Sequence, residues 1–165
     1  MAGASGGLLA AHVTAGGAFG FLAAGMIPYL ARLMRLIIGT ATGYKGTENL
    51  INELSLARRI LQLSPSDPLP IGVGYLGWQL EQPTANPEVV LSAALDNQVR
   101  AIWLAFGNNL DKWIKFIRSY DAEHTRAPKT TIFVQVASVE EALVASNEWG
   151  VDVLVAQGLA SDSAR

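Results

Sequence analysis

The segment Gly150-Val-Asp-Val-Leu-Val-Ala-Gln-Gly158 is a short apolar run that ends in a polar amide and a glycine. A run this rich in aliphatic residues predicts a strand covered on both faces, as in a parallel sheet flanked by helices. In α/β proteins of this kind, ligands bind just beyond the carboxyl ends of the strands. The end of this strand is therefore where we expect a site.

The chain before this segment alternates between helical and strand patterns. Apolar residues recur every three or four positions over Glu48–Leu63, which predicts a helix. Strand-then-helix units come next, with strands at Ile71, Ala101, Ile132 and Val153. This alternation predicts a parallel sheet with right-handed crossovers, in either a (β/α)8 barrel or a doubly wound arrangement.

Turn and capping signals set the expected boundaries of each element. Strands are predicted at Phe19–Ala24, Ile71–Leu76, Val99–Phe106, Thr130–Val136 and Val151–Ala156. Helices are predicted at Leu8–Ala15, at Glu48–Leu63, from Asn86 to Asp96, after Asn108 or Asn109, and from Ser138 to Trp149. Ser138 and Glu141 have the spacing of a capping box.

The length limits how much of a barrel the chain can form. A complete eight-stranded barrel typically needs about 250 residues, whereas this chain has 165 residues and five predicted strands. We therefore expect the fold class to be α/β, with a single partial (β/α)8 TIM-barrel domain over residues 1–165. Residues 26–42 are expected to be an insertion and residues 159–165 a divergent tail.

The composition excludes several classes of site. Half of the residues are hydrophobic and the net charge is −2, with no basic stripe of the kind that binds nucleic acid. The absence of cysteine excludes disulfides, thiolate metal ligands and cysteine nucleophiles. Only His12 and His124 are available as imidazole ligands, which argues against a histidine-rich metal site.

The amino-terminal region has no charged residue from Met1 to Ala31. Such a run can be a transmembrane helix or a signal peptide. Frequent glycines interrupt it, which favours a buried helix, a turn and a buried strand in a cytoplasmic protein. Residues 26–42 predict an amphipathic helix with Arg32 and Arg35 on one side, then a glycine-rich connector. That helix can lie on a membrane surface, on a partner or on its own domain.

Two short motifs match catalytic or binding patterns without their usual context. Gly72-Val-Gly74-Tyr-Leu-Gly77 matches the dinucleotide pattern G-x-G-x-x-G, which requires a helix to begin there. Pro83 and Pro87 interrupt the segment after Gly77, so we favour a strand whose glycines permit close approach to the backbone. A G-x-S-x-G match centred on Ser5 lacks the preceding strand that a serine nucleophile needs.

Other polar and aromatic residues have simpler interpretations. Asp121, Glu123, His124 and Arg126 are interpreted as a solvated helix end, and the four tryptophans as core or helix–sheet packing. Gln135 and Gln157 each lie near the end of an otherwise apolar strand. A buried amide must find a hydrogen-bond partner, and a bound cofactor can supply it.

Several segments in order resemble the nitronate monooxygenase (2-nitropropane dioxygenase-like) family, in the form found in fungal members. The resemblance rests on Met1-Ala-Gly3, Ala15-Gly-Gly17, Pro70-Ile-Gly-Val-Gly-Tyr-Leu-Gly-Trp78, Ala101-Ile-Trp-Leu-Ala-Phe-Gly107, Val134-Gln-Val136, Ser138-Val-Glu-Glu-Ala142 and Asp152-Val-Leu-Val-Ala-Gln-Gly158. It implies a (β/α)8 barrel that holds FMN without a covalent link and oxidises alkyl nitronates, or nitroalkanes, with O2.

The resemblance also implies which residues contact the flavin. Met1, Ala2 and Gly3 match a loop that lies against the ring, and Gln157 and Gly158 match the strand end that contacts it. Gly74 stands where many relatives have a flavin-contacting asparagine. The first strand and a downstream segment with the proposed catalytic histidine have no counterpart here, so no catalytic residue is assigned.

Two functions are therefore expected from the sequence. In the first, the chain is a nitronate monooxygenase by descent, with weak FMN binding and impaired or absent activity. In the second, it is a non-catalytic half-barrel that self-associates, or docks on a full-length paralogue, through open sheet edges.

Overall fold

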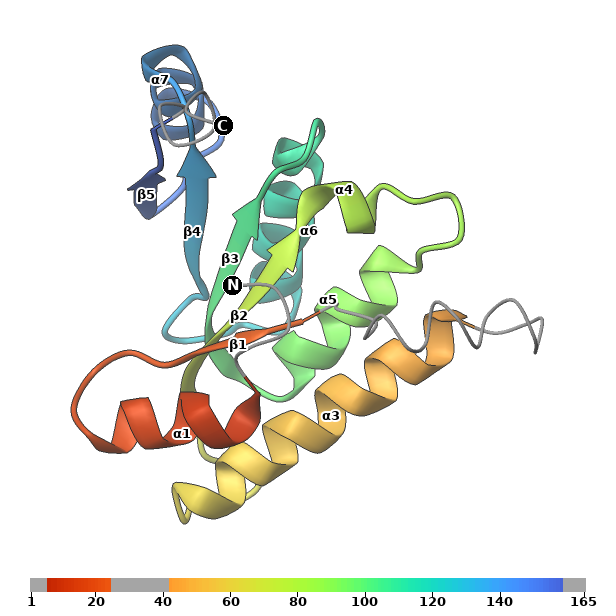
Figure 1. Ribbon diagram of the computed structural model, residues 1–165, viewed down its shortest axis with the longest axis vertical. Helices are drawn as coiled ribbons and strands as arrows, with labels where there is room; N and C mark the ends of the chain where they lie inside the picture. The colour runs from red at the N-terminus through yellow and green to blue at the C-terminus, as the bar shows by residue number, and fades with distance from the viewer. Residues whose placement is uncertain (1–5, 25–41, 159–165) are drawn as a thin grey trace, which may run out of the picture.

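The structure is a computed structural model that describes residues 6–24 and 42–158, with side chains described from residue 47 onward in the second range. The predictions for Met1, Ala2, Gly3, Ser5, the segment 26–41 and the tail 159–165 lie outside the described residues. Within the described residues, one sheet has five strands in the order β1-β2-β3-β4-β5, and all four pairings are parallel (Figure 1).

The elements alternate as the sequence predicts. The strands are β1 (Phe21–Ala23), β2 (Leu69–Leu76), β3 (Val99–Ala105), β4 (Thr131–Val136) and β5 (Val153–Ala156). The helices are α1 (Gly7–Ala15), α3 (Thr42–Ile60), α4 (Gly77–Leu80), α5 (Pro87–Asp96), α6 (Leu110–Glu123) and α7 (Val139–Asn147). Among residues 6–24 and 42–158, no helix combines the length and apolar character that crossing a membrane requires.

The strand order excludes a doubly wound arrangement for the described strands. Each strand pairs with the next along the chain, so every crossover advances across the sheet in the same direction. Right-handed crossovers then place all connecting helices on one face. Helix α1 packs on α3, α3 on α5 and α5 on α6 (Figure 1). A doubly wound sheet requires a reversal of strand order, which these five strands lack.

The two faces of the sheet therefore have different surroundings. Leu22, Val73, Ile102 and Ile132 share one rung of the register and are all buried in the core with residues of the helices. The opposite face, which we call the open face, contains Phe21, Trp103 and Phe133, and these three side chains are only half-buried. Since side chains alternate along a strand, the aliphatic rows face the helices and the aromatic rows face away.

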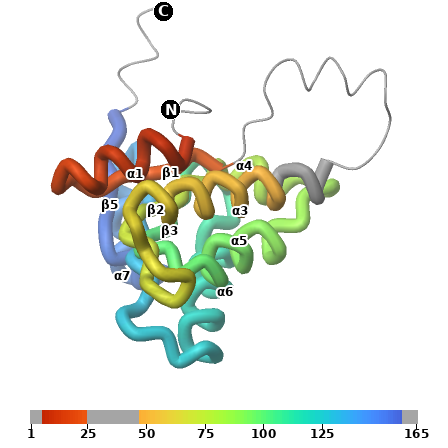
Figure 2. The backbone as a smooth tube through the Cα atoms, turned by 90° about the horizontal axis from the view of Figure 1, so that it is seen from below, coloured from red at the N-terminus to blue at the C-terminus, as the bar shows by residue number. Residues whose placement is uncertain are grey.

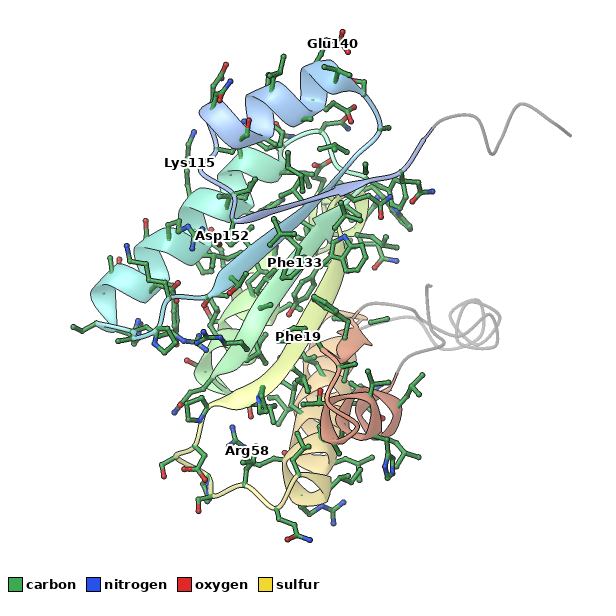
Figure 3. The ribbon with its side chains drawn as sticks, turned by 90° about the vertical axis from the view of Figure 1, so that its left-hand side faces the viewer. Phe19, Arg58, Lys115, Phe133, Glu140 and Asp152 are labelled. Atoms are coloured by element: carbon green, nitrogen blue, oxygen red, sulfur yellow. The ribbon has the colours of Figure 1, made fainter. Side chains whose placement is uncertain are left out.

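Aromatic side chains cover much of the open face. The ring of Phe21 meets Trp103 and Phe133 edge-on, each with centroids 5.2 Å apart. The ring centroids of Phe19 and Phe133 lie 6.4 Å apart, and Figure 3 shows these two residues close together on the sheet. Edge-to-face pairs of this kind add stability beyond the area that they bury.

Four sequence predictions need correction. Helix α3 begins at Thr42 rather than Glu48, and the sequence does not predict the short helix α4. Strand β5 is not covered on both faces, because it is the last strand of the described sheet; its Leu154 is 39% exposed. Trp78 is 48% exposed rather than packed, because α4 lies beyond the end of β2.

Candidate functional site

The carboxyl ends of the five parallel strands lie along one edge of the sheet, which we call the carboxyl edge. On the open face near this edge, the Gln135 side-chain Nε2 donates to Oε1 of Gln157 over 2.6 Å. Gln135 pairs with Val155 in the register, and Gln157 comes directly after β5. The two amides that the sequence singled out therefore find a partner in each other.

The bond between these amides leaves two polar atoms that make no hydrogen bond with a described residue. They are the Gln135 Oε1, an acceptor, and the Gln157 Nε2, a donor. Gln157 is exposed and Gln135 is half-buried, so both atoms belong to the edge of the open face rather than to the core. An acceptor beside a donor can hydrogen-bond to the edge of a planar heterocycle that presents a donor beside an acceptor.

Gly74 leaves open space on the same face. A Cβ atom built at Gly74 meets nothing closer than the Leu22 carbonyl oxygen at 3.8 Å. Trp103 is its partner in the register, and the buried indole N–H of Trp103 makes no hydrogen bond with a described residue. A flat ligand over Gly74 would lie next to an aromatic ring and an unsatisfied donor.

The other glycines of the G-x-G-x-x-G match serve packing. Gly72 and Gly74 lie inside β2, where no phosphate-binding loop exists. A Cβ at Gly72 would collide with the Phe21 ring, and one at Gly77 would lie 2.6 Å from the Gly107 Cα. The interpretation of this motif as a strand open to close approach is confirmed at Gly72, and α4 has only four residues.

Helix N-termini at the carboxyl edge are already occupied by carboxylates. The Glu81 Oε1 accepts from the backbone N–H groups of Asn108 and Asn109, at 2.7 and 2.8 Å, just before α6. At α7, the Ser138 Oγ accepts from Glu141 N, which confirms Ser138 as the N-cap. The Glu141 Oε2 accepts from Ala137 N, one residue before the cap, rather than from Ser138 N as in a standard capping box. The free N–H groups and positive dipole that bind phosphate are therefore engaged at both ends.

Two exposed aromatic residues mark the rim, and the sequence does not predict them as site residues. Trp78 comes after β2 and Phe106 after β3, and the Trp78 N–H donates to the Phe106 carbonyl over 2.9 Å. Phe106 has a φ of +57°, which is rare for a bulky residue. Such strain collects at functional sites, and no local sequence signal distinguishes it from an ordinary strand end.

The opposite, amino edge of the sheet contains a second cluster. A pocket of about 410 Å³ lies there, lined by Pro68, Leu95, Asp96, Gln98, Val99, Arg100, Tyr120, His124, Arg126, Ala127 and Pro128. The Tyr120 hydroxyl donates to Asp96. The pKa of Tyr120 is raised to about 12, chiefly by burial and to a smaller extent by this hydrogen bond. Burial also lowers the pKa of Arg126.

The interpretation of residues 121–126 as a solvated helix end is wrong for Asp121. Its side chain is 2% exposed and accepts hydrogen bonds from Thr130 N and Oγ1, each at 2.8 Å. Arg126 reaches inward as well, to the carbonyls of Leu95 and Val99. Glu123 and His124 are exposed, as predicted.

The described histidines and acids do not form a metal site. His12 is exposed in the last turn of α1, and His124 lines the amino-edge pocket. No group of three histidine, aspartate or glutamate side chains is close enough to hold a metal ion in the part of the chain that the structure describes.

Comparison with known proteins adds no family to this description. No family model, curated protein or solved structure matches the chain.

Proposed function

We propose that the carboxyl edge of the open face binds the isoalloxazine ring of FMN, and that the five strands belong to a flavin-binding (β/α)8 barrel of the nitronate monooxygenase type. The observation that carries this proposal is the Gln135–Gln157 amide pair at the carboxyl edge. It lies on the same face of the sheet as the open space at Gly74, which is two strands away from Gln135 on β2. The strand order supports it, because a barrel also places consecutive parallel strands side by side and all helices outside.

The described residues fit the ring of the flavin but not its phosphate. Gln157 Nε2 and Gln135 Oε1 would face polar atoms of the ring, and Gly74 would leave room for its face. The N-termini of α6 and α7 offer no phosphate site, because Glu81 and Glu141 already accept from the nearby backbone N–H groups. A dianionic phosphate next to these carboxylates would be repelled.

The residues of this edge also limit the chemistry. When bound, a flavin supplies the electron acceptor for nitronate oxidation. A neutral nitroalkane must first lose a proton to a base. Of the described acid–base groups, Glu81 is engaged at α6 and Glu141 at α7. A backbone hydrogen bond, and then one from Ser138, lowers the pKa of Glu140, which makes it a weaker base. Neither His12 nor His124 lies at this edge. We therefore propose ring binding without turnover of neutral nitroalkanes by the described residues.

Flavin titration tests this proposal. We expect the purified chain to bind FMN and riboflavin with dissociation constants within about 2-fold of each other, because no group among the described residues recognises the phosphate. Gln157→Ala should weaken both by roughly 10-fold, since one hydrogen bond to the ring is lost. Flavin fluorescence and absorbance measure both effects.

The control is Asn147→Ala, which removes an exposed amide at the far end of α7 and should leave flavin affinity unchanged. A preference for FMN of more than about 10-fold would show that a phosphate site exists. Absence of riboflavin and FMN binding, or binding that Gln157→Ala does not alter, would refute the ring site. Turnover of a nitroalkane by the FMN-loaded chain would refute the proposed lack of a base.

A second candidate function is association with another copy of this chain or with a related barrel. Apolar side chains are exposed at both ends of the helical layer. At one end, α1 exposes Leu8, Leu9 and Val13, and at the other, α7 exposes Val139 and Leu143. Leu154 on β5 continues the second set. Within the described sheet, β5 pairs on one side only. Apolar patches beside an unpaired strand favour pairing with another chain.

Sedimentation over a range of concentrations tests association. We expect the chain to self-associate, and Leu143→Lys combined with Leu154→Lys to shift the population toward monomer by placing charge in the contact. Val89→Lys is the matched control, because Val89 is equally exposed, at 56%, but lies on α5 in the middle of the helical layer. A wild-type chain that remains monomeric at all concentrations would refute self-association.

A further inference from the structure

The amino-edge pocket lies at the opposite end of the sheet from the proposed flavin site. It forms where α5 and α6 end and β3 begins, from residues 95–100 on one side and residues 120–128 on the other. Figure 2 views the chain from below and so looks toward this edge. Its volume of about 410 Å³ falls within the range of small-molecule sites.

The acidic groups in and beneath this pocket already accept hydrogen bonds from other residues. Asp96 accepts from the Tyr120 hydroxyl. Asp121 accepts two hydrogen bonds from Thr130 and lies 4.0 Å from Arg126. Neither carboxylate bonds to Arg100.

The guanidinium groups of Arg100 and Arg126 have N–H donors that make no hydrogen bond with a described residue. Arg126 gives one N–H to the Leu95 carbonyl at 3.2 Å and one to the Val99 carbonyl at 2.5 Å, which leaves further N–H groups of its five. Arg100 is half-buried and makes no hydrogen bond or ion pair with a described residue. Two guanidinium groups in one pocket, one of them without a counter-ion, favour an anion.

The remaining walls are mainly apolar and flat. The rings of Tyr120 and His124 stack with centroids 4.0 Å apart and planes 15° apart. Pro128 adds an exposed apolar ring to the lining, whereas Leu95 and Val99 are buried beneath it and Gln98 contributes a polar amide. An inorganic ion would leave these surfaces uncovered, whereas an organic body would cover them.

We propose that this pocket binds a small organic carboxylate, with its carboxylate at Arg100 and Arg126 and its apolar body along Tyr120 and His124. Arginine holds carboxylates through paired N–H donors, and such charge-assisted bonds are about twice as strong as neutral ones. The site is independent of the flavin proposal, because it uses different residues at the other edge of the sheet.

Calorimetric titration of the full chain with benzoate tests this site. We expect binding that benzyl alcohol, which has the same ring without the charge, does not reproduce. Arg100→Gln should weaken benzoate binding by roughly 10-fold, since the paired guanidinium donors are lost. Arg59→Gln is the matched control, because Arg59 is exposed on α3 and is not part of the pocket.

A second variant guards against a folding defect. Arg100→Lys keeps the positive charge and should retain more benzoate affinity than Arg100→Gln, while circular dichroism shows both to be folded. Equal affinity of Arg100→Gln and wild type, or equal binding of benzyl alcohol and benzoate, would overturn the proposal. Absence of benzoate binding to the wild-type chain would overturn it as well.

Discussion

Asp121→Ala is expected to lower the free energy of unfolding by about 3 kcal/mol. Asp121 is buried at the end of α6, and its two carboxylate oxygens accept from the Thr130 backbone N–H and hydroxyl. Alanine would leave both donors buried without a partner and would remove the charge beside Arg126. Each unsatisfied buried donor costs about 1–3 kcal/mol. Urea unfolding monitored by tryptophan fluorescence measures the loss.

Asp111→Ala on the same helix is the matched control. Asp111 accepts from Lys115 one turn along α6 at the protein surface, with a distance of 3.1 Å. The pKa of Asp111 is lowered chiefly by this hydrogen bond. Exposed pairs of this spacing contribute only about 0.3–0.5 kcal/mol. Equal destabilisation by the two substitutions would show that the Asp121–Thr130 contact does not stabilise the end of α6.

Gly72→Ala is expected to destabilise the chain by about 2 kcal/mol, while Gly74→Ala, two residues along β2, should be neutral or slightly stabilising. Both glycines face the open side of the sheet. The new Cβ at position 72 would collide with a Phe21 ring carbon, so the ring or the strand must move. The new Cβ at position 74 has open space, and alanine is more favourable than glycine within a strand.

A double-mutant cycle isolates the cause. Phe21→Ala removes the ring that the new methyl group meets, so Gly72→Ala should cost much less in that background than in the wild type. The same cycle with Gly74→Ala should show no coupling. If Gly72→Ala costs the same with and without Phe21, the conflict with the ring is not the reason for glycine at position 72.

Local sequence signals predict the elements well. Hydrophobic periodicity and turn residues indicate the five strands. The Ser138 side chain caps the Glu141 N–H as predicted, because the two residues are three positions apart. The predicted start of α3 is too late, because Thr42–Thr47 contains glycines and few apolar residues. The predicted insertion falls mainly on residues that the structure does not describe.

Contacts between distant residues cannot be predicted in this way. The cap of α6 comes from Glu81, 27 residues before Asn108, rather than from an asparagine side chain at the helix start. Asp121 is expected to be solvated because its neighbours in sequence are charged, yet folding brings Thr130 to it. Gln135 and Gln157 are each unusual in the sequence, but their hydrogen bond depends on the register of β4 and β5.

The sequence by itself determined that the chain forms an α/β protein with parallel strands, because the hydrophobic periodicities of helices and strands depend only on residues that are close together in the sequence. It also marked Gly74, Gln135 and Gln157 as unusual positions. Only the tertiary structure decided that the strands succeed one another in a singly wound sheet, in which the described connecting helices share one face. It also decided that Arg100 and Arg126 share a pocket at the amino edge. These outcomes depend on which strands pair and which helix ends meet, and residue spacing along the chain does not encode them locally.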